Sequence, residues 1–354
     1  MENLITESNI PVLMLSNADL QWSLDDIRES INMTENLVGA LKEIGHPVSC
    51  LYVESNNLPE LLSPYSPTEY IVFNWCEELP GLSYSAALVT QELEQRGFTY
   101  TGSDSFALEL GQDKHRIKHR LKANGIPTPP WQTFTSADIP AWSRFPAIVK
   151  PSYEHCSFGI TREAVVQTMP ELIHRVHYVL DELKQPAIVE DFIDGREFHV
   201  GVIGNGLIHV LPPAEIDYSS FDDIHDRLCT YQANFDKTSL AYQLTMPKLP
   251  ASLTCQQLSA LKKIVSAAYR ATNCRDYARM DIRLREDTFY VLDVNHNADL
   301  SPDTSIVLGA GLIGLTYGML GSVLINLAAQ RHPKFKLKIH KEKIGEKRCL
   351  ELLE

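Results

Sequence analysis

The sequence lacks the features of a secreted, membrane-spanning or disulfide-linked protein. Its first residues, MENLITESNIPVLML, include acidic side chains and a short apolar run, whereas a signal peptide has a basic head and a long apolar stretch. Glycines interrupt the most apolar segment, residues 304–329, before it reaches the length of a membrane span. The seven cysteines form no CxxC pair. These absences predict a cytoplasmic protein with reduced thiols and no membrane partner.

Positive charge is also scarce. The 354 residues include 32 Lys and Arg against 45 Asp and Glu, which gives a net charge of −13. A large nucleic-acid surface needs clustered Lys and Arg, so we expect no nucleic-acid partner. Cys and His show no zinc-ligand spacing, and the phosphate-loop pattern GxxxxGK[ST] is absent. The composition, 44% apolar and 22% charged, is that of a globular protein with two or three domains.

Strands alternate with helices in the first part of the chain. Short apolar runs at 10–15, 48–53 and 70–73 predict buried strands. Apolar residues at helical spacing predict helices over 25–45 and 83–96. This order predicts a parallel sheet covered by helices on both faces.

Beyond residue 125, antiparallel hairpins are mixed with helices. Gly125 and the prolines after it end a helix predicted over 113–124 and mark a domain boundary. A Gly-Asn-Gly turn at 204–206 separates two apolar runs and predicts a hairpin. Residues 278–284 and 288–294 predict a second hairpin. This part is therefore predicted to be α+β. The Lys- and Glu-rich tail from His332 is predicted to be a solvated extension.

The last hairpin carries the most informative polar residues. Asp293 and Asn295 are two positions apart on one strand, so their side chains share a face. Asp281 on the neighbouring strand can lie opposite them. Three oxygen ligands on one face suit Mg²⁺, with Mn²⁺ as an alternative. From the pattern alone, a hairpin with a polar outer face fits equally well.

Two other segments suit a nucleotide. Lys150 ends an apolar strand and precedes a loop with small residues, which can place an ammonium and backbone N–H groups around phosphate. Glu190 and Glu197 flank a turn at a strand end, where backbone can bond an adenine edge and a carboxylate can hold ribose. Taken alone, a surface lysine and a common Asp-Gly turn are the simpler explanations.

Together these segments resemble the ATP-grasp enzymes, and within them the D-alanine–D-alanine ligase family, from about residue 12 to 329. Five motifs in order carry the resemblance: Asp113-Lys114 with Gly125-Ile-Pro-Thr-Pro, Lys150-Pro-Ser, Glu197, Arg279-Met-Asp281 and Asp293-Val-Asn295. The resemblance implies a three-part ATP-grasp fold, α/β plus α+β. Its parts would be an N-terminal parallel α/β domain (1–125), a small central lid (126–200) and a C-terminal domain with the metal site (201–354).

The resemblance implies a role for each matching residue. Lys114 and Lys150 would contact the phosphates of ATP, and Arg279 would stabilise an oxyanion. Mg²⁺ would be bound by Asp281, Asp293 and Asn295. The other nucleotide contacts would come from Ser157, Glu190, Asp191, Phe192, Ile193 and Glu197.

The implied reaction joins a small carboxylate to an amine. The carboxylate would take the γ-phosphoryl group of ATP to give an acyl phosphate, and the amine, expected to be an amino acid, would then displace phosphate. A genuine D-alanine–D-alanine ligase and an ATP-binding regulatory protein without turnover are the alternatives. A homodimer stays open.

Two positions depart from the family in ways that affect the chemistry. Asp299 stands where the family has a glycine whose N–H faces the oxyanion, so Asp299 is a candidate catalytic residue that attracts a different amine. In the alternative, the loop is shifted and Ser301 or Asp303 lines the site. Asn234 stands where the family has a lysine that reaches the phosphates, and Arg227 or Lys237 would have to replace that charge.

Overall fold

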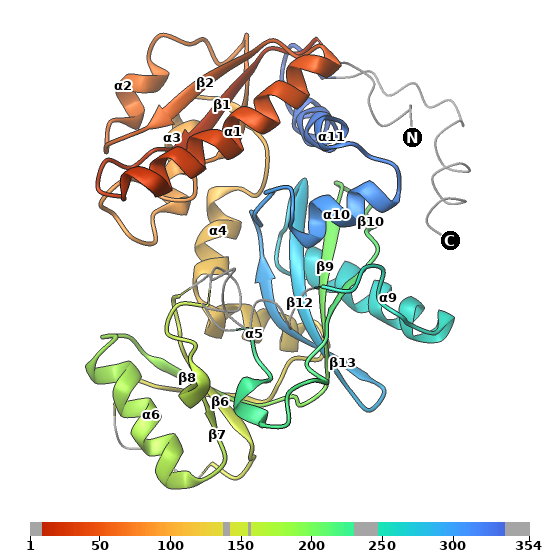
Figure 1. The fold of residues 1–354 in the computed structure, drawn as a ribbon. Coiled ribbons are helices and arrows are strands. Elements are labelled where there is room, and N and C mark those ends of the chain that lie inside the picture. The colour runs from red at the N-terminus through yellow and green to blue at the C-terminus, as the bar shows by residue number, and fades with distance from the viewer. Residues whose placement is uncertain (1–8, 137–141, 155–156, 230–246, 337–354) are drawn as a thin grey trace.

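The computed structural model of the protein describes residues 9–136, 142–154, 157–229 and 247–336. In these residues the strands form three sheets, which lie in three parts of the molecule (Figure 1). Asn234 and Lys237, and the tail beyond residue 336, lie outside the described residues. The predicted combination of a parallel α/β part with antiparallel sheets is confirmed.

The N-terminal sheet is parallel and has the order β2-β1-β3-β4. Its central strand β1 is buried along its whole length, which explains why it reads as an unbroken apolar run. The first helix begins at Ser23, whose side chain accepts the N–H of Asp26, and ends at Gly45, which takes the left-handed conformation at φ 113°. The elements are β1 (Val12–Asn17), α1 (Leu24–Ile44), β2 (Val48–Val53), α2 (Leu58–Leu62), β3 (Ile71–Trp75), α3 (Ala86–Gln95) and β4 (Thr99–Tyr100).

The lid is a small antiparallel sheet of order β5-β8-β6-β7 covered by one helix. Leu172 and Val176 of that helix share a core with Val149 and Val189 of the sheet. The lid elements are β5 (Trp131–Phe134), β6 (Ala147–Pro151), the 3₁₀ turn η2 (Arg162–Ala164), β7 (Val165–Val166), α6 (Met169–Asp181) and β8 (Ala187–Asp191).

The large antiparallel sheet has the order β10-β9-β12-β13, with β11 also paired to β9. Phe198 and Met280 of this sheet pack against Leu261 and Val265 of α9. The elements are β9 (Arg196–Ile203), β10 (His209–Val210), β11 (Ala214–Ile216), η3 (Ile224–Asp226), α9 (Cys255–Ala271), β12 (Tyr277–Arg285), β13 (Thr288–Asn295), α10 (Ser305–Leu312) and α11 (Tyr317–Ala329). The boundary predicted at residue 200 falls inside β9.

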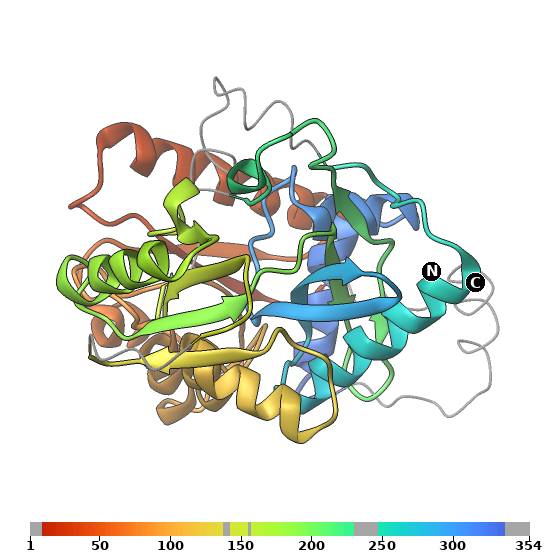
Figure 2. The ribbon, with the colours of Figure 1, turned by 90° about the horizontal axis from the view of Figure 1, so that it is seen from below.

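Two helices join the parts. The helices α4 (Ser105–Gln112) and α5 (Lys114–Ala123) follow the N-terminal sheet, and residues of both belong to the core of the large sheet. The side chain of Asp113 caps α5 by accepting the N–H groups of His115 and Arg116. In both views the end of β8 lies beside the β12–β13 hairpin (Figures 1 and 2), and Arg285 pairs with Asp191 at 2.7 Å there.

The last helix, α11, returns to the N-terminal sheet and packs against α1 (Figure 1). Among the described residues no single helix is long and apolar enough to cross a membrane. By length and composition, α10 and α11 pass that test as a pair, bent by 101°.

Gly318 provides a test of the contact between α11 and α1. A Cβ at this position would lie 2.4 Å from the carbonyl oxygen of Ala40, a backbone atom that cannot move without shifting α1. We expect Gly318→Ala to lower the free energy of unfolding in urea by about 1–3 kcal/mol.

The control is Gly311→Ala, because a Cβ there meets nothing within 4 Å and the residue lies in α10. This variant should be neutral or stabilised by up to about 1 kcal/mol, from helix propensity alone. A Gly318→Ala protein as stable as the wild type would show that the two helices do not touch as described.

Candidate active site

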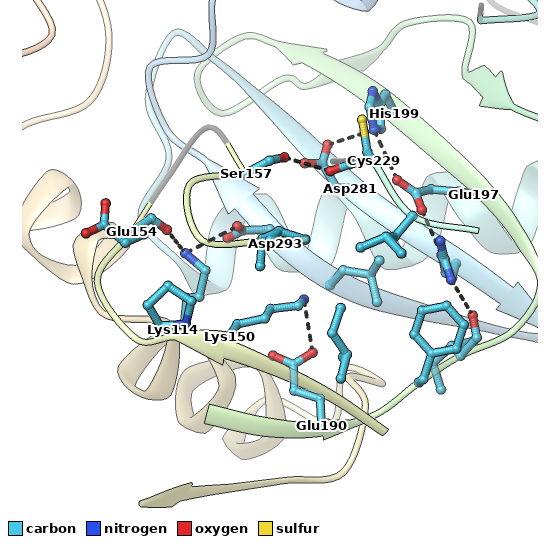
Figure 3. Close-up of a pocket in the computed structure, with 18 of the residues that line it drawn as sticks. Lys114, Lys150, Glu154, Ser157, Glu190, Glu197, His199, Cys229, Asp281 and Asp293 are labelled. Atoms are coloured by element: carbon cyan, nitrogen blue, oxygen red, sulfur yellow. Dashed lines mark hydrogen bonds and ion pairs between the residues drawn. The ribbon is translucent and has the colours of Figure 1, made fainter. Parts of the chain in front are cut away.

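A cavity lies where the lid sheet meets the large sheet (Figure 3). Its lining comes from α5, β6, β8, β9, β12 and β13 and the loops beside them. Most residues that the sequence assigned to the site line this cavity: Lys114, Lys150, Ser157, Glu190, Asp191, Phe192, Ile193, Glu197, Arg279, Asp281 and Asp293. Asn295 and Asp299 are not among the lining residues. The structure thus brings together groups as far apart in the chain as Lys114 and Asp293.

The candidate metal ligands meet on the β12–β13 hairpin. Asp281 and Asp293 are direct cross-strand partners, and the register of the two strands shifts immediately after Asp281. Asn295 donates its Nδ2 to Asp281 Oδ2 at 3.0 Å, so the third predicted ligand also lies beside the first. In the described residues no three His, Cys, Asp or Glu are grouped to hold a metal ion. The candidate set is instead two carboxylates and one amide, whose oxygens suit Mg²⁺.

The cations of the cavity contact carboxylates. Lys114 Nζ lies 3.8 Å from Asp293 Oδ2 and donates to the carbonyl oxygen of Glu154 (Figure 3). Arg279 binds Asp281 with two hydrogen bonds, of 2.7 and 2.9 Å. Burial works to lower the pKa of Arg279, but Asp281 outweighs it and raises that pKa. Lys114 and Arg279, which suit a polyanion, and Asp293 and Asp281, which suit a cation, thus neutralise one another within the cavity.

Glu190 is almost fully buried on β8. One of its oxygens, Oε2, lies 3.4 Å from Lys150 Nζ (Figure 3), and the other, Oε1, lies 3.3 Å from Lys118 Nζ. Sequence reasoning missed Lys118, although its spacing of four residues from Lys114 on a helix places both lysines on one face. Glu190, which is predicted to lie beside adenine, therefore has a neighbour, Lys118, that the motifs did not indicate.

Glu197 is held by Arg283, which the sequence analysis also missed. Arg283 Nε donates to Glu197 Oε2 at 2.7 Å, and Nη1 donates to the carbonyl oxygen of Ile193 at 3.0 Å. Burial works to raise the pKa of Glu197, but Arg283 and then His199 outweigh it and hold that pKa at about 2. Arg283 lies two positions after Asp281 on β12, so strand alternation was the signal that indicated it.

Ser157 closes the cavity on the lid side. Its hydroxyl donates to the carbonyl oxygen of Cys229 at 2.8 Å, and its backbone has φ 60°. Burial raises the pKa of the Cys229 thiol to about 12, so this thiol stays protonated at neutral pH. Cys156, one of the seven cysteines, lies outside the described residues.

Asp299 occupies an exposed position in the loop after β13. Its Oδ1 accepts the backbone N–H of Ser301 at 2.8 Å and the Ser301 hydroxyl at 2.7 Å. Desolvation, followed by repulsion from Asp299 and Glu78, raises the pKa of Glu77 to about 7. The carboxylate of Asp299 is therefore near Glu77, and the catalytic role assigned to Asp299 stays a prediction.

Comparison with known proteins agrees with this geometry. The family profile described as D-ala D-ala ligase C-terminus matches residues 121–321. The chain belongs to this family. The resemblance to ATP-grasp enzymes of the D-alanine–D-alanine ligase type is confirmed.

Two relatives match most of the chain. An uncharacterized protein of Sinorhizobium fredii, y4sG, is 32% identical over 311 residues, covering 85% of this chain and 88% of its own length. A D-alanine–D-alanine ligase of Aquifex aeolicus is 29% identical over 303 residues, covering 84% of this chain and 94% of its own.

Solved structures show the same fold. The crystal structure of D-alanine–D-alanine ligase from Bacillus anthracis complexed with ATP superimposes with a TM-score of 0.71. It is 19% identical and covers 91% of this chain and 98% of that one.

The Glu197–Arg283 pair is open to test by mutation. Arg283→Met leaves a buried carboxylate without its main counter-ion, so we expect a loss of about 3–5 kcal/mol in the free energy of unfolding in urea. The double variant Glu197→Gln/Arg283→Met removes both charges and should recover most of that loss.

Arg270→Met is the control, since Arg270 is exposed on α9. This substitution should lower the free energy of unfolding by no more than about 0.5 kcal/mol. If Arg283→Met were as mild as Arg270→Met, the pair would not carry the stability assigned to it.

Proposed function

We propose that this protein is an ATP-dependent ligase that joins a carboxylate to an amine through an acyl phosphate. The observation that carries the proposal is one cavity in which Asp281 and Asp293 face Lys114, Lys150 and Arg279. Such a site holds a metal-bound polyphosphate and neutralises charge as a phosphoryl group is transferred. The family and the relatives named D-alanine–D-alanine ligase support the same chemistry.

Each part of the nucleotide has a matching surface. Lys114 and Lys150 would hold the phosphates, and Glu197, fixed by Arg283, would accept hydrogen bonds from ribose hydroxyls. The buried backbone of residues 191–193 would meet the adenine edge. Mg²⁺ would be held by Asp281, Asp293 and Asn295 and would supply charge neutralisation at the phosphate oxygens.

Charge exchange accompanies nucleotide binding in this proposal. Lys114 and Arg279 contact Asp293 and Asp281 in the described state. A bound polyphosphate would attract Lys114 away from Asp293, and Mg²⁺ held by Asp281 and Asp293 would supply the compensating positive charge. Arg279 would then stabilise the oxyanion that forms when the amine attacks the acyl carbon. The new C–N bond replaces the C–O bond to phosphate, which leaves with its electrons. An amine that binds as an ammonium loses one proton to solvent before it attacks and a second proton as the amide forms.

The amine substrate is proposed to bear a positive charge when it binds. Support comes from Glu77, whose pKa is raised to about 7 by desolvation and then by repulsion from Asp299 and Glu78. An ammonium group placed among them would relieve that repulsion. An amino acid therefore fits this acidic surface through its ammonium group. A cytoplasmic location, a homodimer and the use of Mn²⁺ in place of Mg²⁺ stay predictions.

Phosphate release is the direct test of this function. The protein is given ATP and Mg²⁺ with pairs of amino acids and small carboxylic acids, and phosphate is measured together with the mass of any product. A pair that gives phosphate and an amide supports the proposal. ATP binding without phosphate release for every pair of substrates would favour an ATP-binding regulatory protein without turnover. Asn234 supports this alternative, because it stands where the family has a lysine that reaches the phosphates.

Asp293→Ala should abolish turnover while leaving the protein folded. The side chain is 24% exposed and belongs to the metal-binding set, so its loss opens no core cavity. We expect the rate to fall by at least about 10²-fold at saturating Mg²⁺, with a free energy of unfolding within about 1 kcal/mol of wild type.

Asp287→Ala is the matched control, because Asp287 is exposed at the turn of the same hairpin. It should keep full activity. Normal Mg²⁺ dependence in Asp293→Ala would remove Asp293 from the metal site.

The protein should make little or no D-alanyl-D-alanine. A glycine at position 299 would let backbone approach the oxyanion, whereas Asp299 adds a carboxylate that repels both the oxyanion and a substrate carboxylate. The assay supplies ATP, Mg²⁺ and D-alanine and follows the dipeptide by mass. Robust dipeptide formation would instead identify a genuine D-alanine–D-alanine ligase, as the names of the relatives favour.

A further inference from the structure

A tyrosine of the N-terminal part reaches the lid. Tyr84 lies in the loop between β3 and α3, and its hydroxyl donates to Glu154 Oε1 at 2.5 Å. Gln185 donates its Nε2 to the same hydroxyl at 2.8 Å. Glu154 follows the lid strand β6, and Gln185 precedes the lid strand β8. Tyr84 therefore contacts two segments of the lid, and the proposed chemistry does not use it.

The backbone of Tyr84 is in the left-handed region, at φ 63°. An aromatic residue rarely adopts this conformation, whereas a glycine would adopt it without strain. The residue is 40% exposed, so packing in a core does not explain its presence. An unfavourable backbone conformation at an exposed tyrosine indicates that the contact made by its side chain has a use.

Glu154 connects this contact to the cavity. Glu154 is one of the lining residues, and its carbonyl oxygen accepts a hydrogen bond from Lys114 Nζ (Figure 3). Lys114 Nζ also lies 3.8 Å from Asp293 Oδ2. Tyr84 thus holds the side chain of the residue whose backbone contacts the lysine proposed to bind phosphate.

Tyr84 also lies between two carboxylates that repel one another. Its N–H donates to Glu78 Oε1 at 2.8 Å, and its O–H donates to Glu154. Desolvation raises the pKa of Glu78, the N–H of Tyr84 opposes that shift, and repulsion from Glu154 adds to it. Desolvation and then Glu154 raise the pKa of the Tyr84 phenol to about 12, so it remains a donor at neutral pH. Without this hydroxyl, the repulsion would favour separation of the lid from the N-terminal part.

We propose that Tyr84 is a positioning residue that fastens the lid to the N-terminal part and slows the release of a bound nucleotide. Tyr84 is not among the residues that line the cavity, and it acts through Glu154. When its hydroxyl is lost, the lid separates from the N-terminal part more often and the nucleotide leaves faster. The inference rests on the proposed function, because it requires a nucleotide in this cavity.

The experiment measures how fast adenylyl imidodiphosphate binds to and leaves the immobilised protein, by surface plasmon resonance with Mg²⁺ present. Tyr84→Phe keeps the ring and removes the hydroxyl. It should raise the dissociation rate constant about 5- to 10-fold, the value of one ordinary hydrogen bond. The association rate constant should stay within about twofold of the wild type, because the contacts inside the cavity are unchanged.

Three further variants make the comparison specific. Glu154→Ala removes the acceptor, so adding Tyr84→Phe to it should change the dissociation rate constant by less than about twofold. Tyr84→Gly should release the analogue as fast as Tyr84→Phe does, without a lower urea midpoint of unfolding, because glycine is unstrained at this φ. Tyr65→Phe is the matched control. It removes a hydroxyl from the same part of the molecule, where the Tyr65 ring packs 5.5 Å from that of Tyr70, and should keep the wild-type rate constants.

The possible results separate this inference from the proposed function. A Tyr84→Phe protein that releases the analogue at the wild-type rate would overturn the inference and leave the ligase function standing. Slower association without faster release would overturn it too, as would an equal effect of Tyr84→Phe with and without Glu154. A wild type that does not bind the analogue would refute the proposed function itself.

Discussion

The arrangement of this molecule depends on carboxylates that are buried at the junctions between its parts. A buried carboxylate needs a counter-ion nearby, and here the counter-ions come from distant segments of the chain. Glu190 on the lid strand β8 is paired with Lys118 of α5, and Asp191 on the same strand is paired with Arg285 of β12 in the large sheet. Neither the lid nor the large sheet can therefore be placed without the other. The cavity lies where these requirements meet.

The same pairs prepare the cavity for ligands. In the described state its lysines and Arg279 contact its own carboxylates, so the groups are preorganised without strong net repulsion. On binding, a cation would replace the lysines and Arg279 beside the carboxylates, and a polyanion would replace the carboxylates beside the lysines and Arg279. Such an exchange links the binding of the two, because either ligand alone would leave charges of one sign without compensation.

Much of the site was predictable from the sequence, because its chemistry lies at strand ends and on alternating strand positions. The hairpin with Asp281 opposite Asp293 followed from a spacing of two, and Lys114 and Lys150 followed from motifs. Lys118 was missed because a lysine on a helix reads as solvated, and burial by distant segments is not visible locally. Short elements such as β4, β7 and β11 were missed because two or three residues show no periodicity. The direction of the Asp299 side chain was not predictable, because it is set by two hydrogen bonds from Ser301 within one turn.

The position of α11 has a consequence for how the chain folds during synthesis. Leu320, Leu324 and Ala328 of this helix complete the core that begins with Val12 and Met14. The N-terminal sheet is thus made first by the ribosome but receives this cover last, after the lid and the large sheet have emerged. Until then, its apolar face lies open to other chains and to chaperones. A truncation before residue 317 should therefore harm the beginning of the protein as much as its end.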